Sequence, residues 1–521
     1  MASTPQITQP QPMTGGMLVL ASMALALATF MNVLDVSIAN VSIPALSGDL
    51  GVSISQGTWV ITSFAVANAI SVPLTGFLTQ RFGAVRVFTS SILLFVLASF
   101  LCCMSTSLGM LILFRVIQGA VAGPMIPLSQ SLLLSSYPKA KAGVALTIWS
   151  MTTLIAPVVG PLLGGWITDN ISWPWIFYIN LPIGLLAAGV TWLLYRHRET
   201  PTHSVPIDYV GLGLLIIWVG ALQVMLDKGN ELDWYNSTQI IILTIVSTIA
   251  FCFFLVWELT DEHPVVDLSL FKRRNFWSGT LALSIGYGIF FGNVVLLPLW
   301  LQQDMGYTAT LAGAVLAPVG FLAILFSPFV GKNIHKYDPR LFATLAFSIF
   351  ALILWMRSNF TTDTDFVTIM IPSLIQGVAM AAFFVPLMTL IFSGITPDKI
   401  PAASGLSNFV RILAGSFGAS IFTSAWENGY SVHHSVLVEN INYANPVSQS
   451  VITMLTDGGM SQQQALAFIN NLINKQSATL AANDLTWLSA LLFIALIAFI
   501  WLIRPKKTST ASNSADTSGA H

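Results

Sequence analysis

The stretch MLVLASMALALATFMNVLDVSIANVSI, from Met17 to Ile43, carries one ionisable side chain, Asp35, in 27 residues. A helix needs about 20 predominantly apolar residues to cross the hydrocarbon core of a bilayer. The strands of a membrane β-barrel would instead alternate polar and apolar residues over about ten positions, and this stretch shows no such alternation. It therefore predicts a transmembrane helix that contains a single acid.

The rest of the chain has the same character. Of its 521 residues, 55% are hydrophobic and 8% are charged, with a mean hydropathy of +0.76, whereas soluble domains carry about 25% charged residues. Charges and Gly, Pro or Asn residues separate fourteen apolar runs: 17–43, 55–78, 86–105, 108–134, 142–168, 173–195, 208–226, 238–259, 276–303, 309–331, 340–357, 366–394, 400–426 and 484–503. We therefore predict an all-α integral membrane protein with fourteen spans.

Basic residues predict the orientation of these spans. An even number of spans puts both termini on one side of the membrane. Sixteen Lys and Arg residues fall on that side, and three fall on the other, namely Lys228, Arg357 and Lys475. The positive-inside rule then places both termini in the cytoplasm. Residues 1–16 would form an N-terminal tail, and the Ser/Thr/Ala-rich residues 504–521 would form a disordered one.

An internal repeat divides the spans into two sets. PLTG at 73–76, near the second span, returns 255 residues later as PFVG at 328–331. IQG at 117–119, in the fourth span, returns 258 residues later as IQG at 375–377. Eight spans separate the members of each pair, which predicts two six-span bundles in parallel repeat, as in transporters that rock two halves about a central site. The predicted units are an N-terminal bundle (17–196), two additional spans (207–260), a C-terminal bundle (275–503) and, within it, an outer loop (427–483).

Three charged side chains are predicted to lie well inside spans: Asp35, Arg115 and Arg411. Each costs about 2.5–3.5 kcal/mol at the bilayer centre, so each requires a physical reason. At 1.5 Å per residue, Asp35 lies roughly 13 Å and Arg115 roughly 10 Å from the outer end of its span, so an ion pair between them is geometrically reasonable. We predict that Asp35 carries the transported proton. A static ion pair that only fixes packing is the alternative.

The C-terminal bundle offers Arg411 no acid at comparable depth. We therefore expect its guanidinium to face a wet cavity or to meet backbone carbonyl groups. Two arginines against one aspartate leave a positive core when Asp35 is ionised, which favours neutral or weakly anionic substrates over dications. The candidate substrate contacts, chosen by side-chain type and depth, are Asn32, Phe290, Phe291, Asn293 and Arg411.

The fifth predicted span contains the segment APVVGPLLGG. Pro157 and Pro161 remove helical hydrogen-bond donors and bend the helix. Gly160, Gly164 and Gly165 let another helix approach closely. The segment predicts a functional hinge or a seal between the bundles, and an ordinary kinked membrane helix is the alternative.

Four segments together resemble the major facilitator superfamily, in particular its fourteen-span drug:proton antiporters of the EmrB/QacA type. They are LDVSIANVSIP at 34–44, GFLTQRFG at 76–83, Arg115 with the IQG that follows it, and GPLLGG at 160–165. The resemblance implies that Asp35 and Arg115 couple transport to protons. The residues that it assigns to conformational motifs are Gly76, Arg81, Gly83, Gln118, Gly119, Pro157, Gly160, Pro161, Gly164 and Gly165. Where this chain has Gln80 the family usually has Asp, so no charge-relay role follows for that position.

Shorter segments resemble the branch of this family found in Gram-negative pumps: GTWVITSF at 57–64, IPLSQS at 126–131 and WELTD at 257–261. The resemblance implies a multi-pass protein of the bacterial inner membrane that exports hydrophobic toxic compounds. It also implies two partners besides membrane lipids, a periplasmic adaptor of the EmrA type and a TolC-like outer-membrane channel. The proton motive force would supply the energy, with no bound cofactor.

The predicted outer loop, 427–483, contains one helix signal. Ser461-x-x-Gln464 is a capping-box pattern. Apolar residues follow it at helical spacing: Leu466, Ile469, Leu472 and Ile473. This amphipathic helix either folds down on the outer membrane face of its own bundle or forms a docking surface for a partner, which the resemblance identifies as the adaptor.

Several other functions fit the residues less well. No stretch combines basic residues with interleaved aromatics, so we expect no nucleic-acid binding. Cys102, Cys103 and Cys252 fall in apolar segments, which predicts buried free thiols. Neither they nor the histidines have metal or catalytic spacing, so we expect no metal site and no enzyme activity. A nutrient symporter, a lipid or fatty-acid exporter on the same scaffold, and a non-transporting membrane receptor are the alternatives.

Overall fold

The computed structural model describes residues 12–502 except 53, 139–140, 203–205, 207, 263, 335, 440 and 442–444. Helices form all the regular secondary structure of these residues, which confirms the all-α prediction. The predicted tail at 504–521 and most of the predicted tail at 1–16 lie outside the described residues.

The helices follow the order of the predicted spans. The N-terminal bundle contains α1 (Gly15–Asp49), α2 (Ile54–Gly57), α3 (Trp59–Ser71), η1 (Val72–Leu74), α4 (Thr75–Phe82), α5 (Ala84–Cys103), α6 (Leu108–Ala122), α7 (Met125–Ser136), α8 (Ala142–Asn170), α9 (Trp175–Tyr178) and α10 (Asn180–Tyr195). Between the bundles lie α11 (Tyr209–Lys228), η3 (Trp234–Asn236), α12 (Thr238–Thr260) and η4 (Leu268–Lys272). The C-terminal bundle contains α13 (Arg274–Gln303), α14 (Ala309–Leu316), α15 (Pro318–Asn333), α16 (Pro339–Arg357), α17 (Phe366–Ile391), η5 (Pro397–Lys399), α18 (Ile400–Glu439), α19 (Pro446–Asp457) and α20 (Gln462–Ile500).

Twelve helical segments of the described residues are long and apolar enough to cross a membrane. The other two predicted spans, the fifth and the thirteenth, correspond to α8 and α18, which are 29 and 40 residues long. Buried polar residues make α18 less apolar, since Ser404, Ser407 and Asn408 point into the protein. The chain is therefore a multi-pass membrane protein, and the count of fourteen spans stays a prediction.

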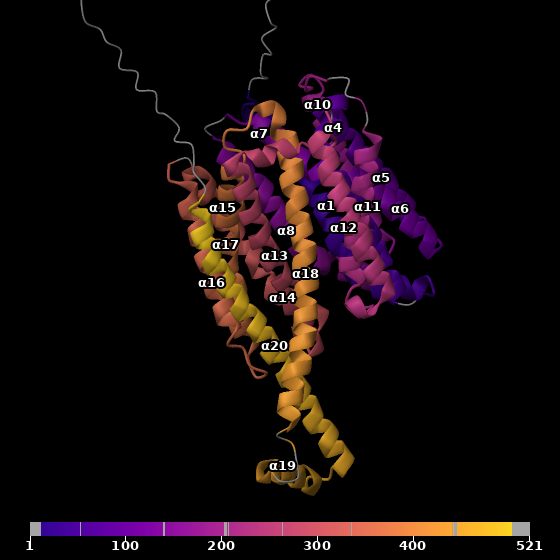
Figure 1. The fold of residues 1–521 in the computed structure, drawn as a ribbon, viewed down its shortest axis with the longest axis vertical. Helices are drawn as coiled ribbons and strands as arrows, with labels where there is room; N and C mark the ends of the chain where they lie inside the picture. The colour runs from indigo at the N-terminus through magenta and orange to yellow at the C-terminus, as the bar shows by residue number, and fades with distance from the viewer. Residues whose placement is uncertain are drawn as a thin grey trace, which may run out of the picture.

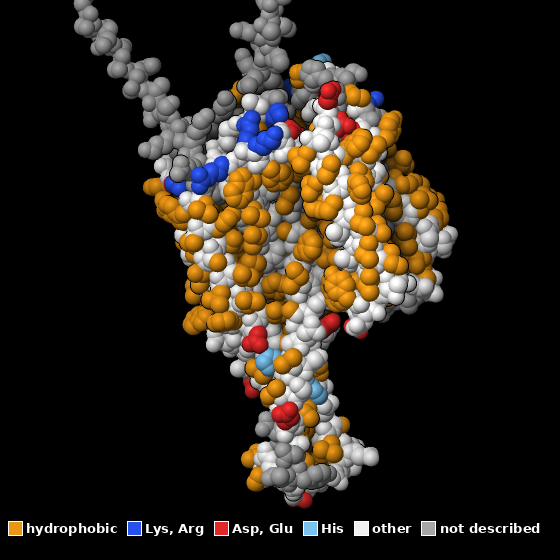
Figure 2. Space-filling view, in the orientation of Figure 1, with side chains coloured by type: hydrophobic (Ala, Val, Ile, Leu, Met, Phe, Trp, Pro, Cys, Tyr) orange, Lys and Arg blue, Asp and Glu red, His pale blue; other side chains and the backbone are white. Residues whose placement is uncertain are grey.

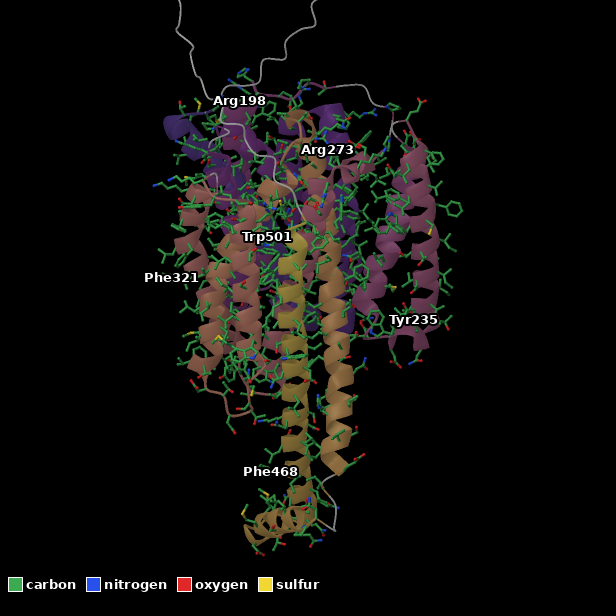
Figure 3. The ribbon with its side chains drawn as sticks, turned by 60° about the vertical axis from the view of Figure 1, so that its left-hand side comes forward. Arg198, Tyr235, Arg273, Phe321, Phe468 and Trp501 are labelled. Atoms are coloured by element: carbon green, nitrogen blue, oxygen red, sulfur yellow. The ribbon has the colours of Figure 1, made fainter. Side chains whose placement is uncertain are left out.

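The two ends of the helical body differ in charge. Figure 2 shows Lys and Arg side chains gathered at one end of the body. A projection extends from the opposite end, and the face in view shows no Lys or Arg side chain on it. Figure 3 places Arg198 and Arg273 at the first end and Phe468 on the projection. We call these the basic end and the stalk end. The positive-inside rule predicts that the basic end faces the cytoplasm.

Glycines of the internal repeat join the two bundles near the basic end. A Cβ atom on Gly76 of α4 would lie 2.7 Å from the Cβ atom of Ala402 on α18. In the other half, a Cβ atom on Gly331 of α15 would lie 3.0 Å from the carbonyl oxygen of Gly143 on α8. The repeat thus places two equivalent close helix crossings between the bundles.

The additional helix α11 lies along the seam between the bundles. The Thr62 hydroxyl of α3 donates a hydrogen bond to Asp227 of α11. On the other side, Trp218 of α11 packs edge-on against Phe409 of α18, with ring centroids 5.8 Å apart. Helix α12 packs outside α11 and is mostly exposed, so Cys252, predicted to be buried, is exposed on its surface. Its exposure follows from the outer position of α12, which an apolar sequence alone does not reveal.

The predicted outer loop is mainly a helical stalk. Helices α18 and α20 are 40 and 39 residues long, about twice the roughly 20 residues needed to span the hydrocarbon core. They continue past the body and carry the short α19 at their tip (Figure 1). The helices therefore continue past the predicted span ends at 426 and 484, and the segment projects from the body instead of folding down on its outer face.

Contacts between the two helices explain why they continue. The indole N–H of Trp426 donates to the carbonyl of Ala478 at 2.9 Å, and a Cβ atom on Gly429 would lie 3.1 Å from the Cβ atom of Ala481. The capping box at Ser461 is confirmed, because it caps the first turn of α20. The indole of Trp426 and small residues on both helices therefore hold the stalk together, where the polar sequence of 427–483 suggested a loop.

Candidate functional site

The buried acid Asp35 lies at the centre of a polar cluster in the N-terminal bundle. Arg115 of α6 donates from Nη1 to Asp35 Oδ2 of α1 at 2.5 Å. The two side chains are 1% and 0% exposed. The structure thus forms the ion pair that the two depths suggested, between helices separated by 80 residues of sequence.

The other carboxylate oxygen of Asp35 accepts two amide hydrogen bonds. Asn180 of α10 donates at 2.8 Å and Gln118 of α6 donates at 3.2 Å. The same two amides also donate to the hydroxyl of Ser99 on α5, at 3.3 and 2.7 Å. Three helices therefore meet at one carboxylate, and Ser99 of α5 joins the same cluster through the two amides. Asn180 and Ser99 were not predicted, because a single Asn or Ser within an apolar run is unremarkable in sequence.

Arg115 is held on its remaining sides by α3 and α9. Its Nε donates to the carbonyl of Val60 at 3.1 Å. Its guanidinium lies over the rings of Phe64 and Phe177, at 4.3 and 5.4 Å from their centroids. Nη2 is buried with no hydrogen-bond partner among the described atoms. These contacts fix the buried guanidinium in place, where it pairs with one carboxylate.

The glycines of the fifth predicted span pack against the helix that carries Asp35. A Cβ atom on Gly160 would lie 2.5 Å from the Cβ atom of Ser37, and one on Gly164 would lie 3.0 Å from the carbonyl oxygen of Ile38. These contacts join α8 to α1 inside one bundle, so at these positions the segment does not seal the seam between bundles. Gly165 is partly exposed on the same helix.

Pro157 and Pro161 lie within the continuous helix α8, and their side chains are outside the described residues.

The loop motif is organised by a glycine and a distant glutamate. Gly83, between α4 and α5, has φ +92°, a conformation that L side chains rarely adopt. The carboxylate of Glu199 accepts from the backbone N–H groups of Val85 and Arg86 at 2.9 and 3.0 Å, and thereby caps α5. A Cβ atom on Gly83 would lie 2.4 Å from that carboxylate.

Two further motif residues lie in this half. The guanidinium of Arg81 lies 5.7 Å from the ring centroid of Phe82. A Cβ atom on Gly119 would lie 2.4 Å from the carbonyl oxygen of Phe64, so this glycine permits the close crossing of α6 and α3 that brings Arg115 to its site.

Among the described residues, Arg411 donates to a side-chain amide and not to the backbone carbonyl groups that were one of its two expected partners. Its Nη2 donates to Asn408 Oδ1 at 2.8 Å, and its guanidinium lies 4.8 Å from the ring centroid of Tyr287 and 5.7 Å from that of Phe384. Aromatic faces attract a cation through their quadrupole, which offsets part of the cost of burial. Helix packing brings these two aromatic rings to Arg411, and no sequence spacing indicates them.

This cluster joins the two bundles. Phe384 packs edge-on against Trp149 of α8, with ring centroids 6.5 Å apart. Asn408 donates to Gln130 Oε1 of α7 at 3.4 Å, and Ser404 donates to the same oxygen. Phe291 belongs to the cluster because it stacks on Tyr287 at 5.7 Å.

Of the remaining substrate candidates, the two asparagines lie outside this cluster. Asn32 is 2% exposed and donates to the carbonyl of Ala122 at 3.1 Å within the N-terminal bundle. Asn293 is 4% exposed and donates to Ser489 at 3.2 Å within the C-terminal bundle. Phe290 packs on Phe350 at 6.0 Å and also on Tyr287 at 6.1 Å, so it borders the Arg411 cluster. The structure therefore gathers Phe290, Phe291 and Arg411 around Tyr287 and leaves the two asparagines apart from them.

Arg357 is a buried charge that the sequence reading placed in an outer loop. It is 4% exposed, and its Nη2 donates to Ser373 at 3.0 Å and to Gln376 Oε1 at 2.8 Å. The 258-residue offset of the repeat relates Gln376 to Gln118. By the same offset, Arg357 corresponds to Ser99, and Ser373 corresponds to Arg115. The arginine and the serine therefore occupy exchanged positions in the two bundles.

The offset also relates Asp35 to Asn293. The C-terminal bundle therefore repeats the Arg–Gln–Ser part of the cluster without its acid. The internal repeat is the sequence signal that could have identified Arg357 as a buried residue of an equivalent cluster.

Lys228 is likewise buried at 4% exposure, where it pairs with Glu231 at 2.7 Å.

Known proteins share this architecture. Residues 25–419 match the model of the Major Facilitator Superfamily. The chain is 52% identical to the multidrug export protein EmrB of Escherichia coli K12, over 95% of this chain and 97% of that protein. It is 47% identical to the fatty acid resistance protein FarB of Neisseria gonorrhoeae, over 95% and 97%.

Among solved structures, the human organic anion transporter MFSD10 shares the fold. Its TM-score is 0.56 at 13% identity, and the match covers 91% of this chain and 99% of that one. The family match spans most of the chain and agrees with the two repeated bundles, and the chain therefore belongs to the Major Facilitator Superfamily of membrane transporters.

Proposed function

We propose that this transporter is a proton-coupled multidrug efflux antiporter of the bacterial inner membrane. The observation that carries the proposal is the buried carboxylate of Asp35, which is held by Arg115, Asn180 and Gln118 from two other helices. The high identity to the multidrug export protein EmrB supports the substrate class.

The geometry suggests how a proton changes the bundle. Ionised Asp35 attracts Arg115 and accepts three hydrogen bonds, which ties α1 to α6 and α10. Protonation removes the negative charge, weakens these bonds and releases α1. Since α8 packs on α1 through Gly160 and Gly164, a shift of α1 moves α8 as well. Each entering proton supplies about 2.3 kcal/mol per 100 mV and about 1.4 kcal/mol per pH unit.

Proton release on drug binding tests the coupling. Adding drug to the purified protein in weak buffer should release protons from the native chain and not from Asp35→Asn. Asp49→Asn, a matched change at the exposed end of the same helix, should behave as the native chain. If Asp35→Asn still exchanges protons for drug, Asp35 is a static packing residue and the assignment fails.

Export of fatty acids is a second candidate. The identity to the fatty acid resistance protein FarB favours it, and the buried cation of Arg411 at the junction of the bundles suits a carboxylate. Adding a medium-chain fatty acid in place of drug in the same assay decides between the two substrate classes.

We further propose that the stalk binds a periplasmic adaptor of the EmrA type, which hands substrate to a TolC-like channel. Apolar side chains are exposed along it, including Val432 at 61%, Val436 at 54% and Phe468 at 45%. Exposed apolar residues that gather outside the membrane mark a protein-binding surface.

Charge substitutions on the stalk test this partner. Val436→Glu with Phe468→Glu should reduce co-purification with the adaptor while the membrane body stays folded. Val447→Glu on α19 introduces the same charge at the tip and is the matched control. Undiminished binding by the double variant would exclude the α18 and α20 part of the stalk as the contact with the adaptor.

A further inference from the structure

A small cavity lies in the C-terminal bundle, at the place that repeats the Asp35 cluster. Side chains from α13, α16 and α20 line it, among them Asn293, Arg357 and Thr486. Trp300 and Phe360, stacked 6.0 Å apart, form part of its apolar wall. The centre of a water molecule can occupy about 20 Å³ of it, enough for one or two particles of that size.

The charge inside this cavity is not balanced. Arg357 donates to Ser373 and Gln376, which are both neutral, and its Nε is buried without a hydrogen-bond partner among the described atoms. None of the ion pairs of the described residues includes Arg357. An uncompensated buried charge is strongly unfavourable, because solvation is lost and no opposite charge replaces it.

The N-terminal bundle shows what is missing. There, the equivalent Arg–Gln–Ser cluster includes Asp35, which lies 2.5 Å from its arginine. The repeat puts Asn293 at the position of Asp35, and Asn293 lines the same cavity as Arg357. An amide has nearly the shape of a carboxylate and lacks its charge. The C-terminal bundle thus has the buried cation and a cavity at the equivalent position, without the negative charge that balances the arginine in the N-terminal bundle.

We propose that this cavity binds a monovalent anionic group, of the size of chloride or of a single carboxylate, which takes the electrostatic role that Asp35 has in the other bundle. Arg357 supplies the charge and its free Nε–H supplies a donor. The cavity lies near the stalk end, where α16 ends at Arg357 and the Asn483 amide donates to the carbonyl of Phe360 at 2.8 Å. The site therefore belongs to the outer part of the bundle.

The proposal is independent of proton coupling through Asp35. A bridging water is the competing occupant, since it would satisfy Nε of Arg357 without neutralising its charge. The two occupants differ in one measurable respect. Water gives no dependence of stability on the identity of the anion in solution.

Thermal unfolding of the purified full chain tests the anion. In sodium chloride, and in bromide or formate, the melting temperature should rise above its value in sodium gluconate of equal ionic strength by roughly 2 °C or more, and the rise should saturate. A rise with formate and none with chloride would assign the site to a carboxylate, and a rise with chloride would assign it to free halide ions as well. An equal melting temperature in all salts would overturn the proposal.

Two variants locate the effect. Asn293→Asp places a carboxylate in the wall of the cavity that Arg357 lines, and should raise the melting temperature in gluconate while removing the dependence on anions. Arg357→Gln should also remove that dependence, whereas Arg274→Gln, which changes an exposed arginine at the opposite end of α13, should keep it. Full anion dependence in Asn293→Asp would also overturn the proposal. Bromide gives a second readout, because its anomalous scattering in crystals should peak beside Arg357.

Discussion

Replacing Gly76 by alanine should open the basic end of the protein. A Cβ atom at this position would lie 2.7 Å from the Cβ atom of Ala402 and 3.0 Å from its Cα atom. Non-bonded carbon atoms pack at about 3.5–4.0 Å. Since one partner is backbone, no side-chain rotation relieves the contact. Helices α4 and α18 must therefore separate by roughly 1 Å.

The energetic effect follows from this overlap. Inserting one methyl group into a packed interface costs about 1–3 kcal/mol. At 1.4 kcal/mol per factor of ten, the closed arrangement of the basic ends should become about 5-fold to 150-fold less populated. The variant should still insert into the membrane, because Gly76→Ala adds no polar group and improves helix propensity.

Distances between spin labels measure the opening. Labels at the exposed positions Gln80 and Tyr337, with the native cysteines replaced, report the separation of the two bundles at this end. Gly76→Ala should add a population at longer distance. Ala402→Gly in the same chain should reverse most of it, since the nearest remaining contact is 3.0 Å. Gly213→Ala, where nothing lies within 4 Å, is the control. Unchanged distances, or an opening that Ala402→Gly does not reverse, would refute this reasoning.

Three further substitutions test other parts of the structure. Gly160→Ala should lower transport at least tenfold, because its Cβ atom would overlap α1, the helix that carries the buried acid. Gly189→Ala is the control and should leave transport unchanged, since no atom lies within 4 Å of its Cβ atom. Drug export by matched amounts of inserted protein measures both. Gly83→Ala should destabilise the fold by about 2 kcal/mol, through its positive φ and the displaced Glu199 cap, and a lower melting temperature should show it. Burial raises the pKa of Asp304 to about 6, so the native chain takes up a proton below that pH and should become more stable from pH 7 to 5. Asp304→Asn should flatten this pH dependence of the melting temperature, and an unchanged slope would contradict it.

The candidate site shows how far sequence reasoning reaches. The depths of Asp35 and Arg115 in their spans were sufficient to pair them, because two charges in a largely apolar chain have few other partners. The amide of Asn180 completes the site and was missed, since many uncharged polar residues lie within apolar runs. Arg411 was recognised as buried, but its aromatic partners come from helices distant in sequence.

Hydropathy, charge and two repeated sequence motifs by themselves determined the all-helical membrane fold, the order of the helices and the repeat of two bundles. These properties are local, because each span must bury about 20 apolar residues in lipid whatever its neighbours are. Only the tertiary structure decided which side chains at span ends are buried, as Arg357 is, and which polar segments continue as paired helices, as α18 and α20 do. Burial and helix pairing depend on contacts between residues far apart in the chain, and one-dimensional patterns do not contain those contacts.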